Sequence, residues 1–286
     1  MGDKTSLPRT ESPLTIVVTG GSDGIGAAAV RTLSARGHRV LFVGRSPQKT
    51  ALLAEETGAE PFVADFARLE DVRRLALEIN QRVDHIDVLA NNAGGVFGDR
   101  TPTADGFEKT FQVNHLAPFL LTNLLMDRLV TGRARIVNTS SVAAARFGQL
   151  DLENLAHTTT ASANRAYGDS KLANILHARA LHQRFSARGI SAVAFHPGMV
   201  GTNFAADTTS WFRFVYRTPL RRLILVSPEQ GGATLEHFIL GTPGKDWLSG
   251  EYYSELKHAV PPAQVLDQHL VDQLWERSAA MVSAGR

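Results

Sequence analysis

Residues 19–26 read TGGSDGIG, and they stand between an apolar run and a segment of helical periodicity, 24–36. A glycine cluster alone is often only a turn, but this position between a strand and a helix fits a site for a dinucleotide pyrophosphate. Gly24 lets the backbone approach a phosphate, and Gly26 lets the helix pack closely on the strand. The helix N-terminus would offer free N–H groups and a positive dipole to the phosphates. The expected cofactor contacts in this stretch are Gly20, Ser22, Asp23, Gly24, Ile25 and Gly26.

The same alternation of apolar runs and helical segments continues along the chain. Continuous apolar runs favour strands buried on both faces of a parallel sheet. These runs occupy 14–19, 38–44, 59–64, 86–90, 135–139 and 190–195, and segments of helical length occupy 24–36, 47–57, 68–82, 103–130 and 164–188. Glycines at 37, 58 and 189 follow three of the helical segments, where a left-handed C-cap favours glycine. We therefore predict an α/β fold with a doubly wound, Rossmann-type parallel sheet and helices on both faces.

The composition narrows the class of protein. With 286 residues, 43% of them apolar and 20% charged, the chain suits a single globular domain, which we expect at 14–280 after a polar leader at 1–13.

The net charge of +2 comes with no cluster of Lys or Arg, so nucleic acid is not an expected partner. The absence of cysteine excludes disulfides, thiolate catalysis and cysteine-based metal sites, and it permits a cytoplasmic location. No metal site is expected, and no apolar run reaches the ~20 residues of a membrane span.

The end of the second strand decides which dinucleotide is expected. An enzyme that binds NAD usually has Asp or Glu there, which accepts a hydrogen bond from the ribose 2′-hydroxyl. This chain instead reads VGRS at 43–46. Arg45 can bind a 2′-phosphate through two parallel hydrogen bonds, and Ser46 adds a hydroxyl donor. An arginine exposed in a turn is the alternative interpretation, but we favour NADP(H) as the cofactor.

A tyrosine and a lysine at helical spacing carry the expected chemistry. Tyr167 and Lys171 are four residues apart and therefore share one face of a helix. A nearby ammonium favours the phenolate, so that the pair can exchange a proton with a substrate oxygen near neutral pH. Alone this spacing is more often a solvated helix face, but Ser141 follows the fifth strand at the edge where open α/β sheets bind ligands. A serine hydroxyl there could hold a substrate oxygen as charge builds on it.

Two asparagine motifs accompany this pair. The fourth strand ends in NNAG at 91–94, at the same edge of the predicted sheet. Asn114 interrupts an apolar helix, where a polar amide needs a hydrogen-bond partner. It is either a buried structural clasp or part of a proton relay.

These motifs occur in the order and approximate spacing of the short-chain dehydrogenase/reductase family, and the chain resembles that family over about residues 14–203. The resemblance implies a sheet of about seven strands in the order 3-2-1-4-5-6-7 and a Ser–Tyr–Lys–Asn catalytic set. Tyr167 would be the general acid in reduction and the base in oxidation. Lys171 would bind the nicotinamide ribose and lower the pKa of Tyr167. Ser141, the second serine of its pair, would orient the carbonyl, and Asn114 would hold a water that links Lys171 to solvent.

The resemblance also implies further cofactor contacts. Asp65 would lie near the adenine, and Thr202 would touch the carboxamide side of the nicotinamide. The remaining contacts would come from Phe66, Asn91, Ala93, Gly94, Tyr167, Lys171, Pro197, Gly198 and Val200. His196 could be mistaken for a catalytic base, but no Asp or Ser partner is suggested around it, and we interpret it as structural.

The long stretch between Ser141 and Tyr167, the residues SKLAN at 170–174 and Arg45 resemble the retinol-dehydrogenase-like branch of the family. That branch mostly uses NADP(H) on lipophilic aldehydes, ketones and alcohols. We therefore expect a carbonyl reductase or alcohol dehydrogenase that acts on a bulky, lipophilic small molecule. Two alternatives stay open: an enzyme of the same fold that catalyses epimerisation, dehydration or cyclisation, and a non-catalytic protein that senses NADP(H).

Segment 203–226 is expected to carry substrate selectivity. Its aromatic residues are interleaved with arginines, which fits a lid over a bulky apolar substrate. The alternatives are an amphipathic helix packed on the core and a face that rests on a membrane surface. A helix is then expected to start at 227–228, and a last strand is expected at 247–256. The resemblance also implies a homodimer or homotetramer, formed through the helices that begin near Ala104 and Asn164.

Overall fold

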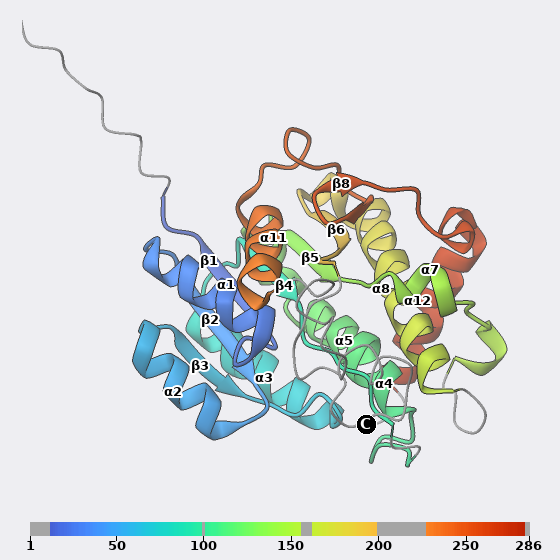
Figure 1. Cartoon of the computed structure of the whole chain (residues 1–286), viewed down its shortest axis with the longest axis horizontal. Coiled ribbons are helices and arrows are strands. Elements are labelled where there is room, and N and C mark those ends of the chain that lie inside the picture. The colour runs from blue at the N-terminus through green and yellow to red at the C-terminus, as the bar shows by residue number, and fades with distance from the viewer. Residues whose placement is uncertain (1–11, 99–100, 156–161, 199–226, 284–286) are drawn as a thin grey trace, which may run out of the picture.

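The computed structural model describes residues 12–98, 101–155, 162–198 and 227–283. Its strands are β1 (Thr15–Thr19), β2 (Arg39–Gly44), β3 (Glu60–Val63), β4 (Val88–Asn91), β5 (Arg135–Thr139), β6 (Ser191–His196), β7 (Tyr252–Ser254) and β8 (Lys257–His258). They form one sheet with the order β3-β2-β1-β4-β5-β6-β7-β8 (Figure 1). The lid predicted at 203–226 and the predicted contacts Val200 and Thr202 lie outside the described residues.

The doubly wound parallel sheet predicted from the apolar runs is confirmed. Neighbouring strands pair in parallel from β3 through β7, in the expected order. The eighth strand differs from the prediction: β8 pairs antiparallel with β7. The chain can reverse there because Glu255 adopts a φ of 55°, which permits a tight turn. The predicted last strand at 247–256 is too long, since Gly250 has a φ of 86° and interrupts the extended backbone before β7.

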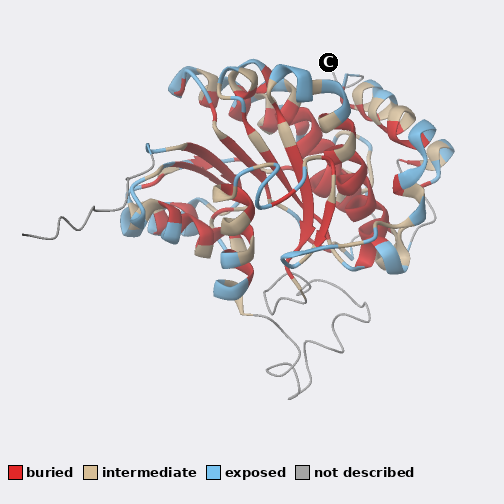
Figure 2. Ribbon diagram, turned by 90° about the horizontal axis from the view of Figure 1, so that it is seen from above, coloured by how far each residue is buried: buried red, intermediate tan, exposed pale blue. Residues whose placement is uncertain are grey.

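Helices cover both faces of the sheet. The longer ones are α1 (Gly24–Ala35), α2 (Pro47–Thr57), α3 (Leu69–Arg82), α5 (Ala117–Leu124), α8 (Ala163–Phe185), α11 (Pro228–Leu240) and α12 (Gln268–Ser283). Alternate residues of a strand point to opposite faces. Val17 of β1 therefore belongs to the core cluster that includes residues of α3, α5, α8 and α12, whereas Ile16 and Val18 belong to the cluster with residues of α1, α2 and α11. Figure 2 shows the buried residues concentrated in the sheet and on the helix sides that face it.

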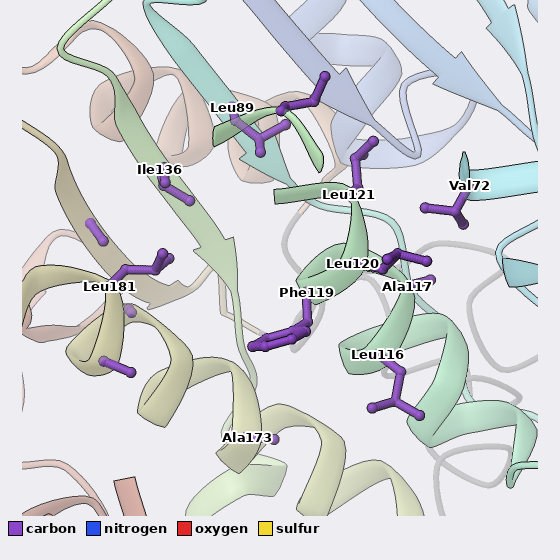
Figure 3. Close-up of a cluster of buried hydrophobic side chains, with 14 of the residues drawn as sticks. Val72, Leu89, Leu116, Ala117, Phe119, Leu120, Leu121, Ile136, Ala173 and Leu181 are labelled. Atoms are coloured by element: carbon purple, nitrogen blue, oxygen red, sulfur yellow. The ribbon is translucent and has the colours of Figure 1, made fainter. Parts of the chain in front are cut away.

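The larger core cluster lies between the sheet and the helices α5 and α8 (Figure 3). Leu89 and Ile136 of the sheet, Phe119 of α5 and Leu181 of α8 are all buried in it. On the outer side, α12 packs against α8 and α5, with the rings of Trp275 and Phe119 4.9 Å apart. The predicted homodimer or homotetramer stays a prediction, and a partner that approached α5 or α8 would also meet α12.

The prediction of a single helix over residues 103–130 is wrong. The main chain instead turns between Thr103 and Phe107. Four helical segments follow: α4 (Lys109–Phe111), the π-helix η1 (Gln112–Leu116), α5 and α6 (Met126–Thr131). Leu125, with φ −96° and ψ 2°, separates the last two. The wide turn of η1 carries Asn114, and π-turns inside helices are frequent at functional sites.

Capping residues set the boundaries of other helices, and the predicted caps Gly58 and Ser227 are confirmed. Ser46 caps α2, Pro47 opens it, and Gly58 closes it with a φ of 71°. Helix α11 starts at the expected place, where the side chains of Ser227 and Gln230 form a capping box. Within the described ranges, no helix combines the length and the apolar character that crossing a membrane requires.

Leu33→Ala in α1 is expected to lower the free energy of unfolding by about 2–5 kcal/mol, because the Leu33 side chain is fully buried against the sheet. Leu52→Ala in α2 is the matched control: Leu52 is 67% exposed, and a change within about 0.5 kcal/mol is expected. Urea denaturation followed by circular dichroism measures both variants. Equal destabilisation by the two substitutions would contradict the packing of α1 on the sheet.

Candidate active site

The carboxyl ends of β1 and β4 are joined by a buried threonine. Thr19 Oγ1 accepts hydrogen bonds from the N–H groups of Asn92 and Ala93, both at 3.0 Å, and donates to the carbonyl oxygen of Ala90 at 3.2 Å. Asn92 Nδ2 in turn donates to the carbonyl oxygen of Thr19 at 3.0 Å. These bonds fix the glycine loop against the end of β4. Neither Thr19 nor Asn92 was predicted as a site residue, although polar residues at the ends of adjacent buried strands were the available signal.

The glycine loop has the close packing that its sequence predicts. A Cβ added at Gly26 would lie 2.2 Å from the carbonyl oxygen of Gly20, so only glycine lets α1 approach the strand end. Asp23 caps α1 by accepting from the N–H of Gly24 at 2.8 Å. Ser22 lies against the end of β2, and Ile25 packs against the core on the α1 side of the sheet. The N-terminus of α1 therefore stands at the sheet edge, as a phosphate site requires.

The end of β2 brings basic residues beside this loop. Arg45 is exposed, and Ser46 accepts from the N–H of Lys49 at 3.4 Å, which leaves its hydroxyl hydrogen able to donate. Lys49 Nζ forms an ion pair of 2.5 Å with Asp23 across the gap between α1 and α2. The sequence analysis did not single out Lys49.

The residues predicted near the adenine and along β4 have internal partners. Asp65 is half-buried after β3 and accepts from the N–H of Ala67 at 3.0 Å, and Phe66 is buried in the core. Asn91 Nδ2 donates to Thr122 at 3.1 Å and to Asn138 at 3.0 Å. Since the Asn91 amide is turned into the fold, a cofactor contact from this residue would have to come from its main chain.

Helix α8 carries Tyr167 and Lys171 to the end of β5. The Lys171 side chain is buried, and its Nζ donates to the carbonyl oxygen of Thr139 at 3.0 Å. The same nitrogen lies 5.8 Å from the centre of the Tyr167 ring. Burial lowers the pKa of Lys171 from 10.5 to about 7, because a buried ammonium loses its hydration. The pair therefore lies together, with a lysine that can exchange its proton near neutral pH.

Asn114 reaches this pair from the π-helix. Its Nδ2 donates to the carbonyl oxygen of Gly95 and to Ser170 Oγ, both at 3.0 Å, and its Oδ1 accepts from the N–H of Gly95 at 2.8 Å. These three bonds hold the Asn114 side chain between Gly95 and α8, and its part in a proton relay stays a prediction. A Cβ at Gly94 would lie 2.9 Å from Asn114 Oδ1 and 3.1 Å from Lys171 Nζ.

The two serines after β5 have different surroundings. Ser140 Oγ is buried and donates to the carbonyl oxygen of Lys171 at 2.7 Å. Ser141 is only half-buried, and its Oγ accepts from the N–H of Ala143 at 3.2 Å. Ser140 therefore joins β5 to α8, and Ser141 is the serine whose hydroxyl hydrogen can still be donated to a substrate.

His196 holds the turn after β6. Its Nδ1 accepts from the N–H of Gly198 at 3.0 Å, so Nε2 carries the proton and donates to Ser254 Oγ at 2.9 Å. Burial lowers the pKa of His196, which favours this neutral form. Both ring nitrogens are occupied within the fold, and the expectation that no serine lies beside His196 is wrong, because Ser254 is its partner. Pro197 and Gly198 directly follow this anchored residue, at the same sheet edge.

The residues at this edge fit a dinucleotide. At one end is the N-terminus of α1 with its glycine loop, and at the other is Gly94, where any side chain would collide with Asn114 and Lys171. The missing side chain lets the main chain at Gly94 lie directly against the lysine and the asparagine. Among the described residues no group of His, Asp or Glu is arranged to hold a metal ion.

Comparison with known proteins gives one family. Residues 14–212 match the family model described as short chain dehydrogenase. A protein of Streptomyces sp. (strain C5) named "Putative daunorubicin C-13 ketoreductase DnrU" is 39% identical over 276 residues, which cover 94% of this chain and 92% of that protein. Retinol dehydrogenase 13 of Homo sapiens is 32% identical over 280 residues, which cover 94% of this chain and 84% of that protein.

Solved structures share the fold over most of the chain. An uncharacterized protein from Mycobacterium paratuberculosis superposes with a TM-score of 0.74 at 29% identity, covering 97% of this chain and 96% of its own. The RhlG/NADP active-site complex from Pseudomonas aeruginosa superposes with a TM-score of 0.66 at 24% identity, covering 87% and 97%. The second likeness concerns the fold alone.

The buried lysine makes stability depend on pH. Between pH 7 and 10.5 the unfolded chain keeps the Lys171 proton while the folded chain loses it, so the free energy of unfolding rises with pH. Relative to Lys171→Met, the wild type is expected to gain up to about 1.4 kcal/mol per pH unit in this window, and nothing below it. Lys257→Met on the exposed β8 is the control. Urea denaturation at several pH values measures the difference, and a difference independent of pH would contradict the burial of an ionisable Lys171.

Proposed function

Because the chain belongs to the short-chain dehydrogenase/reductase family, in its retinol-dehydrogenase-like branch, we propose that it transfers hydride between NADP(H) and a bulky, lipophilic ketone, aldehyde or alcohol. The family makes the chain an oxidoreductase of CH–OH and C=O groups with a nicotinamide cofactor. The observation that carries the proposal is the buried Lys171, whose Nζ lies 5.8 Å from the centre of the Tyr167 ring and packs against the main chain of Gly94.

Tyr167 is the proton donor in reduction and the proton acceptor in oxidation. When bound, the nicotinamide supplies or accepts the hydride. The ammonium of Lys171 stabilises the phenolate that Tyr167 becomes after it gives up its proton. Ser141 donates a hydrogen bond to the same substrate oxygen as negative charge develops there. Each role uses a group whose position at the carboxyl edge of the sheet supports it.

In reduction, a proton from Lys171 restores the Tyr167 hydroxyl, and Lys171 is then reprotonated from solvent through a water held at Asn114. The side chain of Asn114 is committed to Gly95 and Ser170, so a water would be held by the main-chain carbonyl of Asn114. The π-turn of η1 supports this assignment, because it disturbs the regular helical hydrogen bonds at that point. Lys171, with a pKa of about 7, can take up and release the proton near neutral pH.

The preference for NADP(H) rests on the end of β2. No acidic residue stands at 43–46 to accept a hydrogen bond from a ribose hydroxyl, and Arg45 is exposed beside the glycine loop. The guanidinium of Arg45 binds the 2′-phosphate, and the hydroxyl of Ser46 adds a second donor.

A bulky apolar substrate is supported by the surroundings of Tyr167. Val96 and Ala143 are buried against its ring, and Phe147 packs on the same cluster. Val142, beside Ser141, is 39% exposed and offers a further apolar surface. The names of the two relatives refer to daunorubicin and retinol, both large molecules.

We also propose a cytoplasmic location, since a chain without cysteine suits a reducing compartment.

Tyr167→Phe is expected to lower kcat for a reducible ketone or aldehyde by about 10²–10⁴-fold, because it removes the proton donor. The dissociation constant of NADPH should stay within about twofold, since this substitution only deletes one hydroxyl. Tyr253→Phe, in β7 on the opposite side of the sheet, is the control and should keep full turnover. A panel of bulky carbonyl compounds, followed by NADPH absorbance, measures both. Unchanged turnover in Tyr167→Phe would contradict the proposed mechanism.

Arg45→Ala is expected to weaken NADPH binding by about 10–100-fold, the loss of a charge-assisted contact to phosphate. The binding of NADH, which has no 2′-phosphate, should not change. Arg184→Ala, whose partners on α12 are Asp272 and Glu276, removes the same charge far from the glycine loop and serves as the control. Fluorescence titration of the purified protein with both cofactors gives the dissociation constants. A wild type that prefers NADH would overturn the assignment of NADP(H).

A further inference from the structure

The segment that follows Ser141 lies directly against the helix that carries Tyr167. This segment comprises α7 (Ala143–Phe147) and residues 148–150. A Cβ added at Gly168 would lie 2.6 Å from the carbonyl carbon of Phe147 and 2.7 Å from the nitrogen of Gly148. Backbone therefore touches backbone between the segment and α8, one residue after Tyr167.

A buried carboxylate on α8 holds the same segment. The side chain of Asp169 is 0% exposed, and it accepts from the N–H of Gln149 at 2.6 Å and from Arg165 Nε at 2.8 Å. Another nitrogen of Arg165 donates to the carbonyl oxygen of Gln149. The main chain of Gln149 is thus held at both its N–H and its C=O by side chains of α8.

The next residue is held from the opposite side. The N–H of Leu150 donates to Gln264 Oε1 at 2.9 Å, and Gln264 Nε2 donates back to the carbonyl oxygen of Leu150 at 3.0 Å. Gln264 belongs to the short helix η5 (Ala263–Leu266). Two successive residues of the segment are therefore fixed, one to α8 and one to η5.

We propose that Asp169 is a positioning residue that fixes Ser141 relative to Tyr167. The inference rests on the proposed function, in which both hydroxyls must reach one substrate oxygen. Ser141 lies two residues before the segment that Asp169 holds, and Tyr167 lies on the same helix as Asp169. Asp169 does not touch the reacting atoms itself. An error of about 1 Å in such a pair is enough to slow a reaction by about 10²-fold.

The chemistry of this contact requires a carboxylate. The Gln149 N–H and Arg165 Nε both donate to Asp169, and a carboxylate has only acceptor atoms. An asparagine at 169 would turn its NH₂ group toward one of the two donors and lose that bond. Arg165 is 35% exposed, so it can turn to water when its partner is lost, and the fold should survive the substitution.

The test compares Asp169→Asn and Gly168→Ala with the control Asp151→Asn. Asp151 lies just after the segment but is exposed, and among the described residues its carboxylate accepts from the N–H of Glu153 alone. In both test variants kcat per NADPH-binding site should fall at least about tenfold, with the dissociation constant of NADPH within about twofold. Amide hydrogen exchange should rise at Gln149 and at Ala143, whose N–H donates to Ser141 Oγ. Arg165→Gln added to Asp169→Asn should restore part of kcat, because the two amides can pair.

Three results would overturn the proposal: kcat per site that stays at the wild-type value, loss of NADPH-binding sites in parallel with kcat, or unchanged exchange at Gln149 and Ala143. If the wild type reduces no carbonyl compound with NADPH, the proposed function fails separately. In that case amide hydrogen exchange alone tests whether Asp169 positions Ser141. Faster exchange at Ala143 in Asp169→Asn supports the positioning of Ser141, and unchanged exchange overturns it.

Discussion

The ammonium of Lys171 is buried against the main-chain oxygen of Thr139, and the rest of the site is arranged around that contact. A buried charge needs acceptors, so α8 has to lie close to the end of β5. Ser140 strengthens this approach by donating to the carbonyl oxygen of Lys171. Gly94 has to lack a side chain, because a Cβ there would lie 3.1 Å from the lysine nitrogen. The contact between Lys171 and Thr139 thereby constrains the residues at positions 140 and 94, which follow β5 and β4.

Most of the fold could be predicted because its elements carry local signals. Residues 47–57 show this, since a serine, a proline and a glycine mark both ends of α2 in the sequence. The π-helix at Gln112–Leu116 leaves no such signal: it forms where Asn114 bonds to Gly95 and to Ser170, which are distant in sequence. The strand β8 is likewise invisible, since two exposed residues become a strand only through pairing with β7.

In the site, the functional residues were easier to predict from the sequence than their hydrogen-bond partners. The four-residue spacing of Tyr167 and Lys171 follows from helix geometry alone. The choice between the two serines could come only from the family resemblance, because it depends on Ser140 reaching the carbonyl oxygen of Lys171. Asp169 stands between Tyr167 and Lys171 in the sequence, yet the role proposed for it depends on Gln149, twenty residues away along the chain. Long-range pairing of this kind has no periodic pattern in a single sequence.

The most direct test of the account follows the hydride itself. NADPH carrying deuterium at C4 of the nicotinamide, as each of its two stereoisomers, is incubated with the protein and a ketone, and the product is analysed by mass spectrometry. We predict that one of the stereoisomers delivers its deuterium to the new carbinol carbon, with one NADP formed per alcohol. Product that forms without deuterium and without consumption of NADPH would contradict the account and indicate epimerisation, dehydration or cyclisation on the same scaffold.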